Sequence, residues 1–581
     1  MNNAAAARVF NEVAVLLELK GEDDFRVLAY RRVGRAINDL NEDLAEVASR
    51  GELEQLPGVG KAMAEKITEL LREGRLSVRE DLLREVPESL LRLLAVPSLG
   101  AKKVAVLWKR LGIISLDDLK IALRTRKLDD LPGFGPKTIN QLQRGIEFIE
   151  RSAGRTRIGM AWKISTLLGG QVLGMRGMEQ AEFAGSLRRG RETVGNLDLL
   201  CAADEPADVI REFCQLQHVT QVIVAAESRG AVLVNYEPYG TLRVDLRVVP
   251  ARAFGAAWLM YTGSDAHYAR LVERAAQRGL ELKETGLFDA DRFIAGQTEE
   301  EIYHALGMPW VPPELREDRG EFEVPEIPRD LLVQNHLRGE LHMHTVASDG
   351  RNTIEEMAQA ARDRGYEYIC ITDHSQSSVL ADGLKPEVLL GHIHDVHAVG
   401  ARMPGLEVLA GSEVDILSDG RLDYADDVLA QLDWVMASVH AAMTNDIEKN
   451  TRRTLAAIRN PYVNCISHPT GRLINEREAM PIDIEAIARE AARTGTALEI
   501  NANNFRLDLK DEHARLARDL GAMILINTDA HATDQFDQIR FGVMTARRGW
   551  LRKDDVLNTR SAAEIRQFAQ AKRARLRALA G

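Results

Sequence analysis

The chain has 581 residues, of which 45% are hydrophobic and 28% charged, and its formal net charge is −12. This length is too great for one hydrophobic core and predicts three to five domains, while the negative charge argues against attachment to nucleic acid by charge alone. Four scattered cysteines without a C-x-x-C pair do not support a disulfide framework. No apolar stretch approaches the roughly 20 residues of a membrane span, and the N-terminus lacks a signal-peptide pattern, so we expect a cytoplasmic protein without membrane attachment.

Residues 1–150 have the pattern of successive amphipathic helices, and one short motif occurs in them three times. The copies are LPGVGKAMAEKI from Leu56, VPSLGAKKVAVL from Val96 and LPGFGPKTINQL from Leu131. The turn glycines expose backbone N–H groups and the next helix adds its positive end, so an oxygen of a DNA backbone can bind there. The motif resembles the helix-hairpin-helix motif, and Ser98 should weaken the middle copy. The DNA-binding candidates are Gly58, Gly60, Lys61, Gly100, Lys102, Gly133, Gly135 and Lys137.

From about residue 150 the pattern changes from helices to strands. In GSLRRG, Gly185 and Ser186 open a helix whose N–H groups can hold triphosphate oxygens, and Arg189 can neutralise their charge.

Acidic residues follow on two of these strands. Positions 196 and 198 of GNLDLL face the same way on a strand, toward Asp245 if its strand is adjacent. Three carboxylates there would hold two Mg²⁺ or Mn²⁺ ions for nucleotidyl transfer. The chain has Asp198 and Asp245 but Asn196, so we expect weaker metal binding and an impaired reaction.

These strands resemble the nucleotidyltransferase palm of family X DNA polymerases, and MYTGSDAHYARL with TEEEIYHALGMPW resembles that family's thumb. The resemblance implies that Tyr261 and Gly263 line the nucleotide pocket and that Arg247 supports the acidic cluster. The chain departs from this family at two positions. The family has Asp where this chain has Asn196, and usually Asn where it has Tyr268, beside the incoming nucleotide.

The first hairpin resembles the small lyase domain of the same family. The resemblance makes Lys66 the Schiff-base lysine, with Arg26, Tyr30 and Lys61 as candidates for gripping a 5′-phosphate. A lysine on a helix after Pro-Gly can equally be a solvated or phosphate-contacting side chain, and a nucleophilic lysine needs its pKa lowered by neighbours. Both interpretations of Lys66 stay open.

Beyond a charged, proline-containing linker, short apolar runs end repeatedly in turn residues that carry potential metal ligands. Because the ends of parallel strands meet on one face, these side chains should surround one cavity. Imidazole and carboxylate without thiolate suit Zn, Mn or Fe, and nine ligands are enough for two or three ions. The candidate ligands are His342, His344, Asp349, His374, Glu413, His440, His468, Asp529 and His531.

The order HxH, DH, GSE, lone His, SHP and DAH resembles the PHP family of polymerase and histidinol phosphatase hydrolases, over about residues 337–575. The resemblance implies a distorted barrel of seven strand and helix units with Mn²⁺ or Zn²⁺ held by all nine residues. Glu340 stands where the family often has Asp. Arg472 and Arg506 are candidate phosphate contacts, or ordinary ion-pairing arginines.

We therefore predict a multidomain chain with an α-helical helix-hairpin-helix region, an α+β palm and thumb, and a C-terminal α/β distorted (β/α)7 barrel. The expected segments are 1–80 (lyase-like), 81–150 (fingers-like), 151–250 (palm), 251–317 (thumb), 318–336 (linker) and 337–581 (PHP).

The leading hypothesis for the function is a DNA repair polymerase that fills gapped or nicked DNA with deoxynucleoside triphosphates and carries a metal-dependent 3′–5′ exonuclease. A second hypothesis makes residues 1–317 a DNA-positioning module with a degenerate polymerase site serving an active PHP nuclease. A third makes the PHP domain a phosphatase for small esters, which three DNA-backbone-binding motifs argue against. We expect a monomer.

Overall fold

The structure is a computed structural model that describes residues 3–38, 40, 42–94, 96, 99–129 and 131–580. It divides into two compact units, Met1–Ala153 with Asn475–Glu478, and Gly154–Ile474 with Ala479–Gly581. Each unit is described by itself. Among the described residues, none of the helices is both long enough and apolar enough to cross a membrane.

The first unit is helical around one core of aliphatic side chains, with Phe10, Tyr30 and Phe134 among its aromatic members. Each of the three hairpin motifs runs into a helix: Gly60 precedes α4, Gly100 precedes α7 and Gly135 precedes α9. Its helices are α1 (Asn3–Lys20), α2 (Asp24–Asn38), α3 (Leu44–Ser49), η1 (Leu53–Gln55), α4 (Lys61–Glu73), α5 (Ser77–Glu85), α6 (Leu90–Leu93), α7 (Ala101–Leu111), α8 (Leu116–Arg124) and α9 (Pro136–Ser152).

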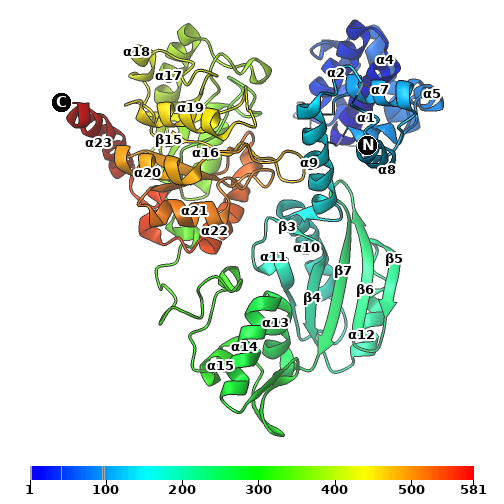
Figure 1. Cartoon of the computed structure of the whole chain (residues 1–581), viewed down its shortest axis with the longest axis vertical. Coiled ribbons are helices and arrows are strands. Elements are labelled where there is room, and N and C mark those ends of the chain that lie inside the picture. The colour runs from blue at the N-terminus through cyan, green and yellow to red at the C-terminus, as the bar shows by residue number, and fades with distance from the viewer. Residues whose placement is uncertain are drawn as a thin grey trace. The chain divides into compact units, whose positions relative to one another are not determined.

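The second unit begins with a five-stranded sheet in the order β2-β4-β7-β6-β5 (Figure 1). The central pair, β4 and β7, is parallel, and the other pairs are antiparallel. The strands are β2 (Gln180–Phe183), β4 (Leu197–Ala202), β5 (Val219–Ala225), β6 (Arg229–Tyr236) and β7 (Gly240–Val249), with a small pair β1 (Thr156–Arg157) and β3 (Thr193–Val194). The helices of this region are α10 (Ile158–Leu173), α11 (Gly185–Arg188) and α12 (Pro206–Phe213).

The thumb follows as three helices and a three-stranded antiparallel sheet (Figure 1). Buried Glu299 lies at its centre, because Arg188 of α11 and Arg316 both bind its two carboxylate oxygens at 2.6–2.9 Å. This ion-pair cluster joins the thumb to α11. The elements are α13 (Phe254–Thr262), α14 (Asp265–Gln277), β8 (Glu281–Lys283), β9 (Gly286–Asp289), β10 (Arg292–Ala295) and α15 (Glu299–Ala305), with the short turns η2 (Ala251–Ala253) and η3 (Pro313–Leu315).

The segment after the thumb is held on both sides rather than free. Glu321 is buried and accepts from the N–H groups of Asp318 and Arg319, and its Oε1 lies 2.8 Å from His267 Nδ1. Arg319 in turn binds Asp511 of the C-terminal region at 2.8 Å. The proline-containing connection predicted from the sequence is therefore an ordered strap.

The remainder is a parallel sheet of seven strands in consecutive order β11 to β17. A parallel bridge between Met343 and Ala530 brings the first and last strands together, so the sheet forms a nearly closed barrel. The strands are β11 (Gly339–Glu340), β12 (Tyr368–Ile371), β13 (Glu407–Asp415), β14 (Trp434–Ser438), β15 (Cys465–Ile466), β16 (Ala497–Asn501) and β17 (Ile524–Asn527).

Helices surround this barrel (Figure 1). They are α16 (Ile354–Asp363), α17 (Pro386–Gly400), α18 (Asp426–Leu429), α19 (Ile447–Arg459), α20 (Ile484–Thr494), α21 (Asp511–Asp519), α22 (Ile539–Arg548) and α23 (Ala562–Ala580), with short turns η4 (Gln334–His336), η5 (Val379–Ala381), η6 (Thr533–Gln538), η7 (Lys553–Asp555) and η8 (Leu557–Thr559). The predicted fold class, with a helical N-terminal region, an α+β palm and thumb and a seven-stranded α/β barrel, is confirmed.

Candidate active sites

The carboxyl ends of the barrel strands carry the predicted metal ligands. His342 and His344 follow β11, His374 follows β12, and Glu413 lies near the end of β13. The remaining histidines and Asp529 follow later strands in the same way, and Asp349 lies in the loop after His344. Because the strands are parallel, all of these ends meet on one face of the barrel. The structure therefore brings together nine residues spread over 190 positions of sequence, from 342 to 531.

The donor atoms of these residues lie close enough together to coordinate the same metal ions. Three groups have atoms within 4.8 Å: His344, Asp349, His374 and His531; His342, His344 and Asp529; and His374, Glu413 and His440. His468 completes the set, because its Nε2 lies 2.8 Å from Glu413 Oε1. Since His344 and His374 each belong to two groups, the arrangement suits adjacent ions that share ligands rather than one isolated ion.

Several donor atoms at this face are buried and have no hydrogen-bond partner. They are His342 Nε2, His344 Nδ1, His374 Nδ1, Glu413 Oε2 and His468 Nδ1. A buried polar atom left unsatisfied costs about 1–3 kcal/mol, so a cluster of them needs a ligand. Imidazole nitrogens and carboxylate oxygens are donors to Zn²⁺ and Mn²⁺. The residues present thus fit a metal cluster, in agreement with the sequence.

Two ligands also have unusual backbone conformations. Asp529 has φ of 54° and His468 has φ of 26°, a region that non-glycine residues rarely occupy. Such strain is maintained only where the surrounding structure holds it, and it concentrates at functional sites. It supports a functional reason for directing these two side chains into the barrel mouth.

A second layer of carboxylates and amides orients the ligands. Glu499 on β16 lies 2.8 Å from His342 Nδ1 and accepts from the backbone N–H of His468. Asp415 lies 2.6 Å from His440 Nδ1, and Asn501 Nδ2 donates to Asp529. Holding Nδ1 of a histidine fixes its tautomer and directs Nε2 toward the metal position. Glu499 was missed from the sequence, although a charged residue inside the apolar strand ALEIN was the available signal.

Three other residues discussed from the sequence have structural partners. Glu340 is buried and accepts hydrogen bonds from Thr528 and Tyr366, and burial raises its pKa to about 7. Arg472 donates to two backbone carbonyls and pairs with Glu192, which leaves it as a structural arginine. Arg506 differs, because its Nε lies 3.6 Å from Asp529 Oδ2 at the cluster.

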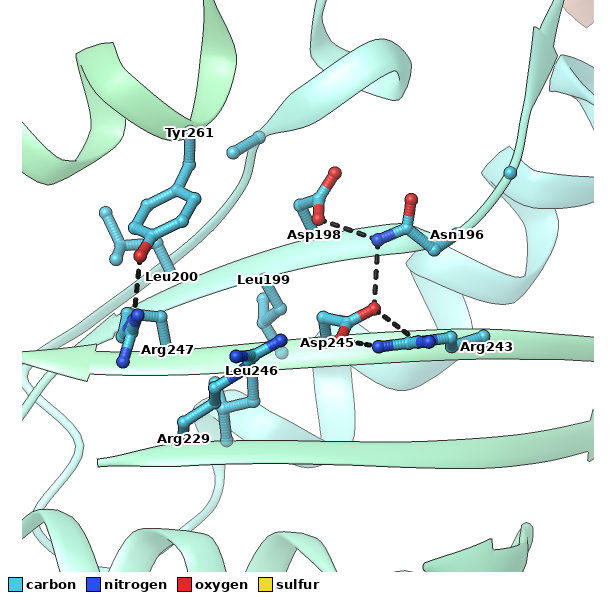
Figure 2. A pocket seen from close by; sticks show the side chains of 12 residues that line it. Asn196, Asp198, Leu199, Leu200, Arg229, Arg243, Asp245, Leu246, Arg247 and Tyr261 are labelled. Carbon is cyan, nitrogen blue, oxygen red and sulfur yellow. Dashed lines mark hydrogen bonds and ion pairs between the residues drawn. The ribbon is translucent and has the colours of Figure 1, made fainter. Parts of the chain in front are cut away.

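The palm places its acidic residues as the sequence predicts. Asp198 on β4 and Asp245 on β7 are direct neighbours in the parallel register. Figure 2 shows Asn196 beside them: its Nδ2 donates to Asp198 Oδ1 at 2.7 Å and to Asp245 Oδ2 at 3.0 Å. Arg243 donates to both oxygens of Asp245 (Figure 2). The amide therefore occupies the position between two carboxylates where a third carboxylate would share metal ions.

This acidic pair faces a cavity of about 540 Å³ that also contains Arg229, Arg247 and Tyr261. Burial is the main cause that raises the pKa of Asp198, to about 6, and the neighbouring charge of Asp245 adds to it. The hydrogen bond from Asn196 acts in the opposite direction. Asp198 is therefore poised for a cation, which would replace a proton at slightly acidic pH.

Of the predicted nucleotide-binding residues, Tyr261 lines this cavity and Gly185 lies against Asp198. Gly185 has φ of 60° and approaches Asp198 so closely that a Cβ there would lie 2.0 Å from its Oδ2. It begins α11 together with Ser186. Tyr261 accepts a hydrogen bond from Arg247 Nε (Figure 2) and donates one to Glu284.

Tyr268 lies next to Gly263, where a Cβ would be 3.8 Å from that of Tyr268. Burial raises the pKa of Tyr268 to about 12. Its ring packs partly into the thumb core rather than being fully exposed.

Arg189 has protein partners in this structure. Its guanidinium donates to the carbonyls of Thr262 and Gly263 and to Glu317. Burial lowers the pKa of Arg189, and Glu317 opposes that effect. The side chain is therefore oriented by the thumb and strap, and contact with a triphosphate would have to use its remaining N–H groups or exchange partners.

In the helical unit the hairpin residues are presented as the motif requires. All eight predicted DNA-binding residues are exposed, while the apolar residue inside each hairpin, Val59, Leu99 or Phe134, is buried. Gly58 and Gly133 have φ of 76° and 87°, conformations that favour glycine. Ser98 lies outside the described residues. Burying the apolar residue anchors each turn and leaves its N–H groups at the surface.

The candidate residues of the lyase-like domain differ in how exposed they are. Lys66 is half-buried on α4, and Arg26 is exposed and bonds to Glu22. Tyr30 is 1% exposed and packs against Phe10, so its expected contact with a 5′-phosphate is wrong. The amphipathic face of α2 directs this ring into the core.

Comparisons with known proteins agree with this architecture. Residues 1–76 match a helix-hairpin-helix domain family, 90–147 a SAM-like helix-hairpin-helix tandem, 257–317 the DNA polymerase beta thumb and 340–503 the PHP domain. The DNA polymerase/3′-5′ exonuclease PolX of Bacillus subtilis (strain 168) is 37% identical over 98% of this chain and 99% of its own length.

Shorter relatives match about two fifths of this chain. A probable phosphatase of Thermoanaerobacter sp. (strain X514) is 30% identical over 40% of this chain and 95% of its own length. One of Caldanaerobacter subterraneus subsp. tengcongensis is 32% identical over 40% of this chain and 92% of its own.

Proposed function

Because the chain belongs to the bacterial family X DNA polymerases that carry a C-terminal PHP domain, we propose that it repairs gapped or nicked DNA with two active sites. The barrel removes nucleotides from 3′ ends as a metal-dependent exonuclease. The palm adds deoxynucleotides at a rate limited by Asn196. The six segments named from the sequence are our proposed domains, and the protein works as a cytoplasmic monomer.

The observation that carries the nuclease is the convergence of nine ligands, five of which have a buried donor atom without a hydrogen-bond partner. Two or three Mn²⁺ or Zn²⁺ ions would be held by them. When bound, such ions supply a nucleophile at neutral pH and neutralise charge at the phosphoryl centre. Glu413 and Asp529 each lie within 4.0 Å of several of these histidines, so they would be the shared carboxylate ligands of the cluster. Asp349 and His531 are about one-third exposed, so they face the side from which DNA enters.

The protein residues around the cluster position the substrate and the ligands. Glu499 and Asp415 hold Nδ1 of His342 and His440, which leaves Nε2 as the donor to metal. Arg506, beside Asp529, can contact the scissile phosphate without leaving the cluster. A duplex end would have to fray to reach a site bounded by loops on every strand end.

In the palm we propose Asp198 and Asp245 as ligands for Mg²⁺ or Mn²⁺, with Gly185, Ser186, Arg189, Tyr261, Gly263 and Tyr268 around the incoming nucleotide. Asn196 keeps the shape of a carboxylate but carries no charge, and its N–H group already binds both aspartates. An ion entering between them must displace these hydrogen bonds. The resulting polymerase is weak, which leaves the palm able to serve mainly as a DNA-positioning module for the nuclease.

A phosphatase acting on small esters is the alternative suggested by the shorter relatives. Those proteins match only 40% of this chain, which also carries exposed hairpin glycines and lysines suited to DNA phosphates. A protein acting on small esters has no use for them. We therefore propose that DNA is the substrate of the barrel and that the eight hairpin residues bind it. Lys66 remains the proposed residue for a lyase reaction on the same DNA.

The nuclease is tested by degradation of a 3′-protruding oligonucleotide in Mn²⁺. Replacing His342 and His344 together with Ala removes two nitrogen donors and should abolish degradation while DNA binding persists. The matched control is His394→Ala with His397→Ala on α17, two exposed histidines outside the cluster. Degradation by the His342/His344 variant at the parent's rate would refute the assignment of the cluster.

A further inference from the structure

A second cavity, of about 600 Å³, lies between the first helix of the palm, α10, and the barrel. Its palm wall includes Arg157, Trp162 and Lys163, and its barrel wall includes Phe505 and Gln535. Both walls belong to the same compact unit. The acidic palm site described above is lined by other residues, so this cavity is a distinct feature.

The barrel wall of this cavity is connected directly to the metal-ligand cluster. Phe505 precedes Arg506, whose Nε lies 3.6 Å from Asp529 Oδ2. Gln535 accepts a hydrogen bond of 2.9 Å from the backbone N–H of His531. Two separate segments that line the cavity therefore each contact a proposed ligand, and a molecule in the cavity would lie beside the mouth of the cluster.

The chemistry of the cavity combines aromatic rings with cations. The guanidinium carbon of Arg157 lies 3.5 Å from the centre of the Phe505 ring, and Phe505 is still 39% exposed. Arg540 lies 5.6 Å from the centre of the Trp162 ring, and Lys163 lines the same wall.

Two carboxylates also line the cavity. They are Asp534 and Asp537, and Asp537 is already paired with Arg364 at 3.0 Å. The cavity thus has three cationic side chains, Arg157, Lys163 and Arg540, and two carboxylates, of which Asp537 is paired with Arg364. Exposed rings next to Arg and Lys are the combination with which proteins bind unpaired nucleic acid, because bases stack on the rings and phosphates bind the cations.

The cavity is built by close contacts between palm and barrel. Asn504 packs against Gly159 of α10, where a Cβ would lie 2.5 Å from its side chain. The rings of Trp162 and Phe541 meet edge-on at 6.1 Å. These contacts fix α10 against the loop that carries Phe505, so palm residues are part of the environment of the barrel.

We propose that this palm–barrel cavity binds the unpaired segment of the DNA strand just upstream of the bond cleaved in the barrel. A base stacks on the exposed part of Phe505, and Arg157 and Lys163 contact the backbone phosphates. The proposal rests on the nuclease function proposed above and adds to it the place where the single strand is held. The palm thereby contributes to exonuclease substrate binding, independently of its own acidic site.

The direct test uses a single-stranded oligonucleotide with 2-aminopurine near its 3′ end and a terminal phosphorothioate bond that resists cleavage. Stacking on Phe505 should quench the fluorescence on binding to the full chain. Phe505→Ala should remove the quenching and weaken binding at least about fivefold, as expected for loss of one stacked base. Phe505→Trp should restore both. Phe293→Ala is the matched control, because Phe293 is 43% exposed in the thumb.

A second measurement separates this inference from the nuclease proposal. Phe505→Ala should raise KM for oligonucleotides at least about fivefold, yet hydrolyse the p-nitrophenyl ester of thymidine 5′-monophosphate at the parent's rate. That small substrate has p-nitrophenol in place of the upstream strand that the cavity is proposed to bind, so its hydrolysis reports that the variant folds. Arg157→Ala, in the palm, should give the same selective loss.

The outcomes distinguish the two proposals. If the parent degrades no DNA, the nuclease proposal fails, while the fluorescence comparison still decides whether the cavity binds the strand. If the parent degrades DNA and Phe505→Ala matches it in KM and quenching, the cavity proposal is overturned. Equal Phe505-dependent binding of a fully paired duplex would also overturn it, because the proposal requires unpaired bases.

Discussion

The substitution Asn196→Asp tests how one charge controls the palm. In the present chain the amide donates to Asp198 at 2.7 Å and to Asp245 at 3.0 Å. A carboxylate in the same place would replace two attractions by two repulsions. At about 3 Å and an effective dielectric constant of about 20, each repulsion is on the order of 5 kcal/mol before the side chains rotate apart. The variant should therefore bind divalent cations far more strongly, because cations remove this repulsion.

The expected consequence is a faster polymerase with greater dependence on metal. Extension across a one-nucleotide gap should be feeble in Mg²⁺ for the parent, partly recovered in Mn²⁺, and at least about tenfold faster after Asn196→Asp, equivalent to about 1.4 kcal/mol in the barrier. The melting temperature of the variant should also fall in EDTA and rise on adding Mn²⁺ more than that of the parent.

Asn196→Ala provides the control, because it removes the amide hydrogen bonds without adding charge. It should not accelerate extension in either metal. Robust Mg²⁺-dependent extension by the parent would refute the reasoning about the missing charge. An Asn196→Asp variant no faster than the parent would also refute it, and would direct attention to Tyr268, whose Cβ lies near Gly263.

Two further predictions concern DNA binding and stability. Replacing Lys61, Lys102 and Lys137 together with Ala should weaken binding to gapped DNA of any sequence and reduce the slope of log K against log salt by about 3. The control Lys127→Ala should change this slope by less than about 1. A loss of binding that depends on DNA sequence would contradict the hairpin assignment. Glu299→Gln should lower the free energy of unfolding by about 3–5 kcal/mol, since two arginines lose their buried partner, and exposed Glu300→Gln should have little effect in the same urea titration.

The loss at Glu299 should depend on pH in a defined direction. Burial would raise the pKa of Glu299, but Arg316 and Arg188 outweigh it and lower the pKa from 4.5 to about 2. The stability from this carboxylate is therefore fully present above about pH 4.5 and is lost as the pH falls toward 2. The difference between the parent and Glu299→Gln should be constant near neutrality and shrink below pH 4.5. A difference that grows on acidification would contradict the ion-pair explanation.

The features that the sequence revealed are those carried by short motifs with strong chemical preferences. His342, His344 and the other ligands could be grouped because each ends an apolar strand, and parallel strands bring such ends together. Strand periodicity likewise predicted that positions 196 and 198 face the same way, toward Asp245 if its strand is adjacent, and the structure pairs β4 with β7. In both cases the pattern within one strand predicts where a side chain points, and the parallel arrangement of the strands brings those side chains together.

What could not be predicted depends on contacts between residues far apart in the chain. Arg189 looked like a free phosphate ligand because its partner, Glu317, lies in a charged segment without a recognisable motif. Glu499 stood out only as a charge inside an apolar strand, and the sequence did not show that its side chain contacts His342. Tyr30 looked accessible because a sequence shows that a helix is amphipathic but not which ring will fill its core. The palm–barrel cavity could not be predicted either, because its two walls come from distant segments and neither segment carries a recognisable motif.

The strap and α22 also bear on how this chain could be divided. Arg548 of the barrel donates to the backbone carbonyl of Arg189 and to Glu317, while Gly190 approaches Met544 closely. Cutting the chain after residue 317 would leave the turn behind α11 without its support and Glu317 without one of its three arginines. A shortened polymerase half would thus be a reorganised protein, and lost extension by it would not measure what the nuclease contributes. Point substitutions in the barrel mouth leave this scaffold in place, so they, rather than deletions, can separate the two chemistries.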